Sequence, residues 1–284
     1  MKIFISYSHQ QKDWVRKRLA PCLVAGGAEV LIDEAQLRVG ARVLGQLDAL
    51  QDGADASLLC FTPEYLASPY CRHEMDRAIL RDQFVPVKLA DCAVPTAEHL
   101  HADLRKEVAS EWDKMLLACG ADLGCEAPHW LSVRDDVRRD LGRGVSVNLV
   151  VSGKPRWREL LKALELPHLQ QINLDNGKTA DRPGLVREIL RAHGDQRAVP
   201  DEPKDIGLLS EFLEQRKPAL AFLRFDHVLH RPYQVDFFAN LRFHLEERNL
   251  TMLIESTAPF ASLLPPEHKL SSLASSAQVE LRGR

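Results

Sequence analysis

The sequence lacks the features that would place it in a membrane or outside the cell. Every apolar run falls short of the roughly 18 consecutive residues that a bilayer-spanning helix needs. The first residues, Met1–Ser6, read as a strand and do not show the charged, then apolar, then small-residue order of a signal peptide. No cysteine belongs to a Cys-x-x-Cys pair, and no cysteine–histidine spacing indicates zinc. We therefore expect a cytoplasmic protein whose reduced thiols are scattered in its core.

The chain also has little excess charge. A net charge of -3 gives no global attraction for nucleic acid or anionic lipid. Hydrophobic residues make up 45% and charged residues 27%, as in globular proteins, which excludes wholesale disorder and fibrous structure. The 284 residues predict two domains at ~150 residues each. We find no internal repeat, and we expect the serine-rich end from Ser271 to be frayed.

The first ninety residues alternate between short apolar runs and amphipathic runs. This alternation predicts a doubly wound α/β fold, with a parallel sheet and helices on both of its faces. The expected strands are Lys2–Tyr7, Glu29–Asp33, Ser57–Phe61 and Phe84–Leu89. Helices are expected over Gln11–Leu23, around Val43–Leu50 and through Met75 and Ile79, and residues 91–142 read as mainly helical.

The second half reads as a smaller α/β unit. The expected strands are Val145–Val151, Ala219–Leu223 and Leu250–Ile254, with helices over Trp157–Leu166 and Gln234–Glu247. The stretch His193–Lys204 reads as a polar loop. We place the boundary between the two domains after residue 125, which gives domains of residues 1–125 and 126–284.

Polar side chains follow several of the expected strands. Ser6-Tyr7-Ser8-His9 ends the first strand and Asp33 ends the second. The third strand leads through Thr62–Ser68 into a helix that contains Glu74, with Ser68 suited to its N-cap. Ligand sites in open parallel sheets collect at the carboxyl ends of the strands, so we expect these residues to meet at one edge.

Three of these segments resemble the Toll/interleukin-1 receptor (TIR) domain family over residues 1–120. Phe4-Ile5-Ser6-Tyr7-Ser8 looks like the opening box of the family. Val30–Asp33 and the loop ending in Gly40 look like its second strand and BB loop. The segment Thr62-Pro63-x-Tyr65-x-x-Ser68-x-Tyr70-Cys71-x-x-Glu74 looks like the part that carries the glutamate of the NAD-cleaving, bacterial-type members. The resemblance implies a flavodoxin-like sheet.

The resemblance further implies cleavage of the nicotinamide–ribose bond of NAD, in antiviral immune signalling activated by self-association of TIR domains. NAD is then the substrate, and no cofactor or metal is expected. Glu74 would be the catalytic residue. The residues expected to bind the substrate are Ser6, Tyr7, Ser8, His9, Asp33, Arg38 and Tyr70.

Cleavage of the nicotinamide–ribose bond needs few catalytic groups. Nicotinamide leaves as a neutral molecule, so no acid has to protonate it, and one ionised carboxylate stabilises the positive charge that builds on the ribose carbon. Hydrolysis to ADP-ribose and cyclisation would use the same glutamate. Ala35 departs from the acidic residue that family enzymes can carry there. The alternative is a non-enzymatic adaptor that binds other TIR domains through Leu37–Gly40.

The second half resembles a degenerate P-loop NTPase of the AAA/STAND kind. Counting from Gly153, the positions that a phosphate-binding loop fills with Gly and Lys hold Arg158 and Glu159. Arg224 stands about where a metal-binding acid belongs, although Asp226 is near. We therefore expect a non-hydrolysing module that regulates or assembles the first domain in response to an unknown ligand or protein.

Overall fold

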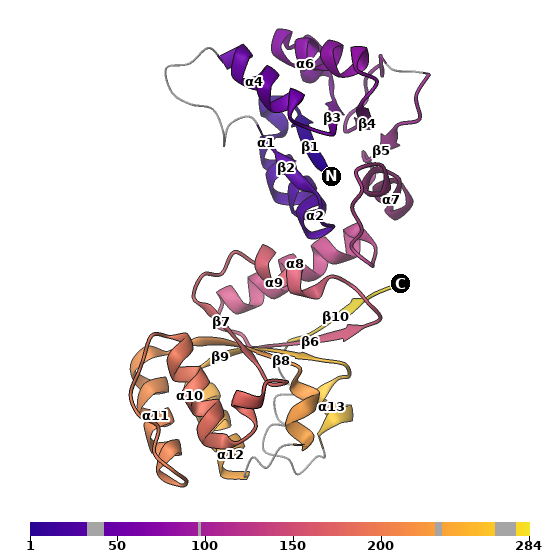
Figure 1. The fold of residues 1–284 in the computed structure, drawn as a ribbon. Coiled ribbons are helices and arrows are strands. Elements are labelled where there is room, and N and C mark those ends of the chain that lie inside the picture. The colour runs from indigo at the N-terminus through magenta and orange to yellow at the C-terminus, as the bar shows by residue number, and fades with distance from the viewer. Residues whose placement is uncertain (33–42, 96–97, 231–234, 265–276) are drawn as a thin grey trace. The chain divides into compact units, whose positions relative to one another are not determined.

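The computed structural model describes residues 1–284 except 33–42, 96–97, 231–234 and 265–276 (Figure 1). The chain divides into two compact units. The first is Met1–Ser132 with Arg158–Ala163, and the second is Val133–Trp157 with Leu164–Arg284. In the part of the chain that is described, no helix combines the length and apolarity that a membrane crossing requires.

The first unit is built on a five-stranded sheet in the order β2-β1-β3-β4-β5. The strands are β1 (Lys2–Ser6), β2 (Glu29–Leu31), β3 (Ala56–Phe61), β4 (Phe84–Lys88) and β5 (Ala102–Asp103). Every neighbouring pair is parallel, and Ser6 at the end of β1 lies opposite Leu59 of β3. This strand order is that of flavodoxin-like folds, so the predicted α/β fold class is confirmed.

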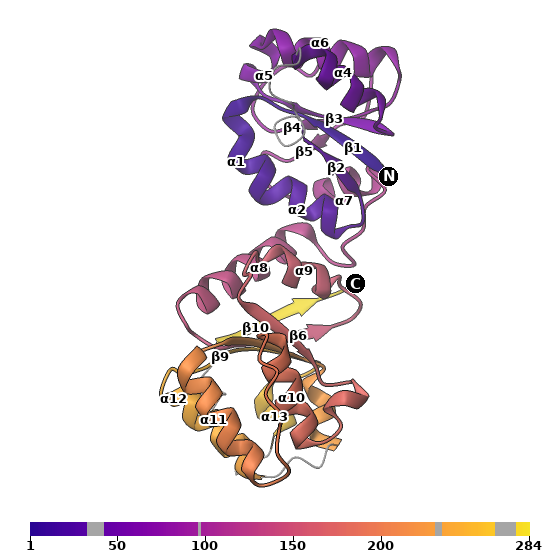
Figure 2. The ribbon, with the colours of Figure 1, turned by 60° about the vertical axis from the view of Figure 1, so that its left-hand side comes forward.

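Helices cover both faces of the first sheet (Figure 2). One face carries α4 (Val43–Asp52), α5 (Pro63–Ala67) and α6 (Pro69–Leu80). The other face carries α1 (Lys12–Trp14), the π-helical turn Val15–Leu19, α2 (Ala20–Ala25) and α7 (Ala109–Ala118). Phe4, Leu59 and Phe61 point toward the first face, since they pack in clusters with residues of α4 and α6. All six cysteines are free thiols and five of them are buried, as predicted.

The second unit contains a parallel sheet in the order β10-β6-β9-β8-β7. Its strands are β6 (Val147–Ser152), β7 (Leu169–Asn173), β8 (Ala219–Leu223), β9 (Thr251–Ser256) and β10 (Ala277–Arg282). Three helices, α10 (Arg182–Ala192), α11 (Lys204–Arg216) and α12 (Val235–Glu246), share one hydrophobic core with β8 and β9. The helix α13 (Phe260–Leu263) also belongs to this unit, whereas the residues of α8 (Ala127–Gly142) and α9 (Trp157–Ala163) are divided between the two units.

The structure corrects the sequence interpretation at three edge strands. The end of the chain, expected to be frayed, contains β10, which pairs in parallel with β6 from Ala277 to Arg282. The segment read as mainly helical contains β5, and β7 was not anticipated. Each of the three lies at the edge of its sheet and is short or largely polar. Such a segment has no apolar run that would predict a strand, and it becomes one by pairing with its neighbour. The expected domain boundary after residue 125 lies just before α8.

Candidate functional site

The site lies at the carboxyl ends of β1 and β3. In the order β2-β1-β3-β4-β5, the chain leaves β1 toward one side of the sheet and β3 toward the other, so these neighbouring strands form the switch point. Ligands of doubly wound sheets bind outside the carboxyl ends at such a point. Ser6 is the last residue of β1, and Thr62 directly follows β3.

Glu74 reaches this point from α6. The Ser68 side chain caps α6 by accepting a hydrogen bond from the Cys71 backbone N–H at 3.4 Å, which confirms its predicted role as a cap. Cys71, Glu74, Met75 and Ala78 recur at helical spacing and are the buried residues of this helix. Glu74 therefore occupies a core-facing position and is only 6% exposed.

The Glu74 carboxylate is hydrogen-bonded to the end of β1. The Ser6 hydroxyl donates to Glu74 Oε2 at 2.5 Å, and the Tyr65 hydroxyl lies 2.9 Å from the same Ser6 oxygen. Hydrogen bonds between a hydroxyl and an ionised carboxylate are short and about twice as strong as neutral ones. The structure thus brings together two residues, 6 and 74, that the sequence placed on separate elements.

Tyr65 is the member of this group that the sequence analysis did not single out as a site residue. Thr62 caps α5 by accepting from the Tyr65 backbone N–H at 3.1 Å, and the Tyr65 ring packs edge-on against Phe61. Burial, together with the nearby Glu74 charge, raises the pKa of Tyr65 well above its usual value, so its phenol stays protonated at neutral pH. The available signal was its place in the Thr62-Pro63-x-Tyr65 segment, which the sequence analysis used only to recognise the family.

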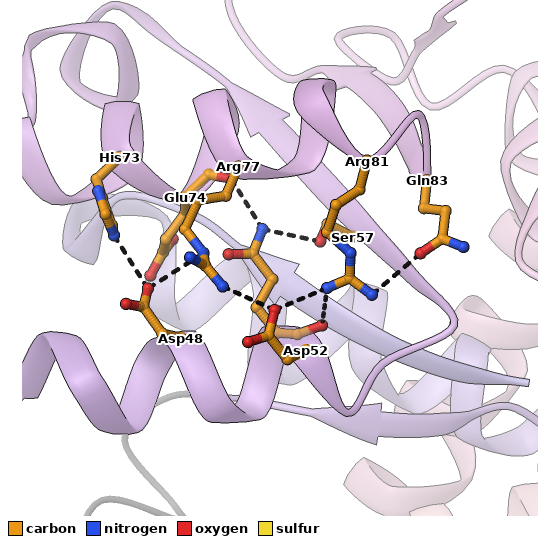
Figure 3. Close-up of polar contacts among 9 residues, drawn as sticks. Asp48, Asp52, Ser57, His73, Glu74, Arg77, Arg81 and Gln83 are labelled. Carbon is orange, nitrogen blue, oxygen red and sulfur yellow. Dashed lines mark hydrogen bonds and ion pairs between the residues drawn. The ribbon is translucent and has the colours of Figure 1, made fainter.

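Polar contacts join α6 to α4 beside Glu74 (Figure 3). Gln51 of α4 donates through Nε2 to the Glu74 backbone carbonyl at 2.8 Å and to Ser57 Oγ at 3.1 Å. A ladder of ion pairs continues along the two helices: His73–Asp48, Arg77–Asp48, Arg77–Asp52 and Arg81–Asp52. These pairs are partly exposed, so each one stabilises little. Together with Gln51 they fix the helix that carries Glu74.

The other residues expected to bind substrate lie in different surroundings. Tyr7 is buried, and its backbone carbonyl accepts from the Cys71 thiol at 3.6 Å. Ser8 is buried and caps the 3₁₀ turn His9–Gln11. His9 is exposed, and Tyr70, at the start of α6, is 56% exposed. Asp33 and Arg38 lie outside the described residues, as do Ala35 and the loop Leu37–Gly40. The described residues hold no group of three or more His, Cys, Asp or Glu side chains that would suit a metal ion.

In the second unit, a tight backbone contact follows β6 where a phosphate-binding loop would begin. Gly153 has a positive φ of 74°, and the Gly283 N–H donates to the Ser152 carbonyl at 2.7 Å. A Cβ on Gly283 would lie 2.5 Å from the Lys154 backbone nitrogen, so the end of the chain packs directly against this turn. The backbone of the turn, which would have to surround a phosphate in a phosphate-binding loop, thus packs against Gly283 of the same unit.

Two acidic side chains, Glu255 and Asp226, lie at or just after the ends of β9 and β8. Glu255 is buried and accepts from the Arg224 backbone N–H at 2.7 Å. The Asp226 carboxylate accepts from the Thr257 backbone N–H at 3.1 Å and from its hydroxyl at 3.1 Å. Asp226 therefore links the segment after β8 to the segment after β9.

Comparison with known proteins gives matches to the first unit. No curated protein matches the chain significantly. Among solved structures, the chain is similar to the TIR domain of the Toll-related receptor TRR-2 from Hydra magnipapillata, with 15% sequence identity and a TM-score of 0.38. That match covers 40% of this chain and 94% of the other. The family model described as TIR domain matches residues 3–117. Residues 3–117, which lie within the first unit, thus match the TIR domain family.

Proposed function

We propose that the TIR domain cleaves the nicotinamide–ribose bond of NAD, with Glu74 as the catalytic carboxylate. The observation that carries the proposal is the position of Glu74, whose carboxylate lies at the carboxyl end of β1, beside the switch point of the sheet, and hydrogen-bonds to Ser6. TIR domains act in signalling, and the family includes members that cleave NAD. The product would be ADP-ribose or a cyclic isomer of it.

The proposed chemistry needs an ionised carboxylate next to the ribose. As the bond to the neutral nicotinamide breaks, positive charge develops on the ribose carbon, and a negative group held in place lowers the energy of that state. A donor on the carboxylate, such as the Ser6 hydroxyl, favours its ionised form. Tyr70 is the proposed ring-stacking residue, because more than half of its surface is open to solvent. Tyr7, Ser8, His9, Asp33 and Arg38 remain the other proposed ligands of the dinucleotide.

We propose that the second unit is a degenerate P-loop-like module that regulates the enzyme or assembles it. Two observations support loss of phosphate binding. The turn after β6 packs against Gly283, and the sequence has Glu159 at the position where a phosphate-binding lysine would be needed. TIR domains associate with one another, so a module that brings copies together would raise the activity of the first unit.

The test is NAD consumption by concentrated purified protein with the products resolved by chromatography. Wild type is expected to release nicotinamide, and Glu74→Gln is expected to release none, because the amide cannot carry the stabilising charge. Glu29→Gln is the matched control, since it makes the same change on an exposed side chain at the amino end of β2. The site lies at the other end of the strands, where β1 and β3 finish. Equal turnover by wild type and Glu74→Gln would refute the proposed role of Glu74.

The second candidate function is a TIR adaptor without catalysis. The small exposed fraction of Glu74 favours it, because a carboxylate closed off from solvent cannot reach a dinucleotide in this conformation. An adaptor would bind TIR domains and leave NAD intact at any protein concentration. Light scattering of wild type and of a variant with Leu37–Gly40 replaced by glycine and serine separates the two: an adaptor loses self-association, with no NAD consumed by either protein.

A further inference from the structure

We infer that Tyr65, Ser6 and Glu74 form a hydrogen-bond chain with one direction, in which Tyr65 and Ser6 are positioning residues that hold the Glu74 carboxylate ionised. The chain crosses three elements, since Tyr65 comes from α5, Ser6 from β1 and Glu74 from α6. The inference rests on the proposed function only for its effect on turnover. The hydrogen bonds themselves are a property of the folded unit.

The direction follows from counting protons. A serine hydroxyl has one proton, and Ser6 donates it to Glu74 Oε2 at 2.5 Å. The contact of 2.9 Å between the Ser6 and Tyr65 oxygens must then use the phenol proton, with Ser6 as acceptor. Both protons therefore point toward the carboxylate. A neutral Glu74 would donate its own proton to Ser6 and reverse the order of both hydrogen bonds.

Both hydroxyls of the hydrogen-bond chain are buried. Ser6 is 1% exposed and Tyr65 is fully buried, so water does not replace either hydroxyl. Hydrogen bonds in such surroundings polarise one another, and a phenol that donates to Ser6 strengthens the bond from Ser6 to the carboxylate. The sequence analysis expected Ser6 to bind substrate. In the structure its hydroxyl contacts the side chains of Tyr65 and Glu74, and its role in substrate binding stays a prediction.

Several other titratable groups lie on the elements packed around this hydrogen-bond chain. The Cys60 thiol of β3 and the Cys71 thiol of α6 lie near Tyr65, and burial raises the pKa of Cys60 so that it stays neutral. Asp48, His73 and Arg77 pair with one another between α4 and α6. The phenol and the serine hydroxyl are the two donors of the hydrogen-bond chain, and removing each of them tests it.

The experiment measures the pKa of the Glu74 side chain by carboxyl ¹³C NMR of the full-length protein, together with kcat and KM for NAD. The Glu74 resonance is the one absent from Glu74→Gln. Ser6→Ala is expected to raise the Glu74 pKa by about 1 to 2 and to lower kcat about tenfold with KM unchanged, the size of one lost hydrogen bond to a charged group. Tyr65→Phe keeps the packing against Phe61 and is expected to raise the pKa by a few tenths.

The double variant gives the sharpest readout. If the phenol acts through Ser6, Tyr65→Phe has no further effect on the Glu74 pKa once Ser6 is alanine, whereas independent effects would add. Ser57→Ala is the matched control, because it removes another buried hydroxyl, on β3, whose contact is with Gln51 Nε2, and it should leave the Glu74 pKa unchanged.

The outcomes separate this inference from the proposed function. Two results would refute the proposed hydrogen-bond chain. One is an unchanged Glu74 pKa in both Ser6→Ala and Tyr65→Phe, and the other is a Glu74 side chain that is neutral in the wild-type protein at pH 7. If the wild-type protein does not consume NAD, only the proposed function is refuted. The NMR measurement still tests whether the hydrogen-bond chain exists. If Ser6→Ala fails to fold, Tyr65→Phe alone carries the test: a raised pKa supports the chain and an unchanged one refutes it.

Discussion

The ion pair between Arg182 and Asp205 offers a direct test of what stabilises the second unit. Arg182 begins α10, and Asp205 lies in the first turn of α11. Arg182 Nε and Nη2 donate to the two Asp205 oxygens at 2.8 and 2.9 Å, and both side chains are 0% exposed. Glu202 lies 3.4 Å from the same guanidinium and is 33% exposed. The pair joins the beginnings of two helices that the sequence analysis did not predict, and the polar loop that it did predict, His193–Lys204, lies between them.

The magnitude follows from the burial of both charges. Removing one partner leaves the other charge in the core without its counterion, which costs about 3–5 kcal/mol. We expect Arg182→Met to lie at the upper end of that range, because it leaves the buried Asp205 unpaired. Asp205→Asn should lie at the lower end, because Glu202 still faces the guanidinium. Replacing both, with Arg182→Met and Asp205→Leu, removes both charges and is expected to cost less than either single change.

Hydrogen exchange followed by mass spectrometry resolves the two units in one protein. Peptides from α10 and α11 should exchange at least about a hundredfold faster in Arg182→Met, since each 1.4 kcal/mol is about a factor of ten. Peptides from β1 and β3 serve as the internal reference. Arg191→Gln is the control, because it breaks the exposed pair of α10 with Glu188. Acceleration below tenfold in Arg182→Met, or a double variant less protected than both singles, would show the reasoning to be wrong.

Two further stability predictions concern the same unit. Burial lowers the pKa of His244 below its usual 6.5, so the unfolded chain binds a proton there that the folded chain does not. The stability of the second unit should therefore fall as the pH drops through about 6.5. Denaturation at pH 7.5 and 5.5 measures this fall, and His244→Gln should make it smaller. A Cβ on Gly184 would lie 2.3 Å from the Lys178 carbonyl oxygen, so Gly184→Ala should lower the denaturation midpoint, whereas Gly207→Ala, with no atom within 4 Å of its Cβ, should raise stability by about 0.5–1 kcal/mol. A lower midpoint for Gly207→Ala would contradict this contrast.

The accuracy of the sequence predictions depends on where each element lies in its sheet. The strands β1 and β8 are apolar runs in the interior of their sheets, and their predicted limits agree with the structure to within one residue. The edge strands β5, β7 and β10 escaped the analysis because pairing with a neighbour stabilises them. Local pattern found the strands that are apolar runs, including the edge strand β2, and missed the edge strands that are very short or largely polar.

The candidate site divides in the same way. The sequence pointed to Glu74 through the segment Thr62–Glu74, and the recurrence of apolar residues around it, at Cys71, Met75 and Ala78, already marks the buried face of a helix. The catalytic role of Glu74 remains a prediction. What no local pattern contains is the contact of Glu74 with Ser6, which lies 68 residues earlier in the chain.

The sequence by itself determined the alternation of strands and helices, the α/β class and the family of residues 3–117, because periodicity and short motifs are local properties of the chain. The tertiary structure decided the strand order, the pairing of edge strands and the partners of buried polar groups. Those depend on which segments meet after the chain folds back on itself. The Ser6 hydroxyl shows the difference: its position at the end of β1 was predictable, whereas its two hydrogen-bond partners come from α5 and α6 across the sheet.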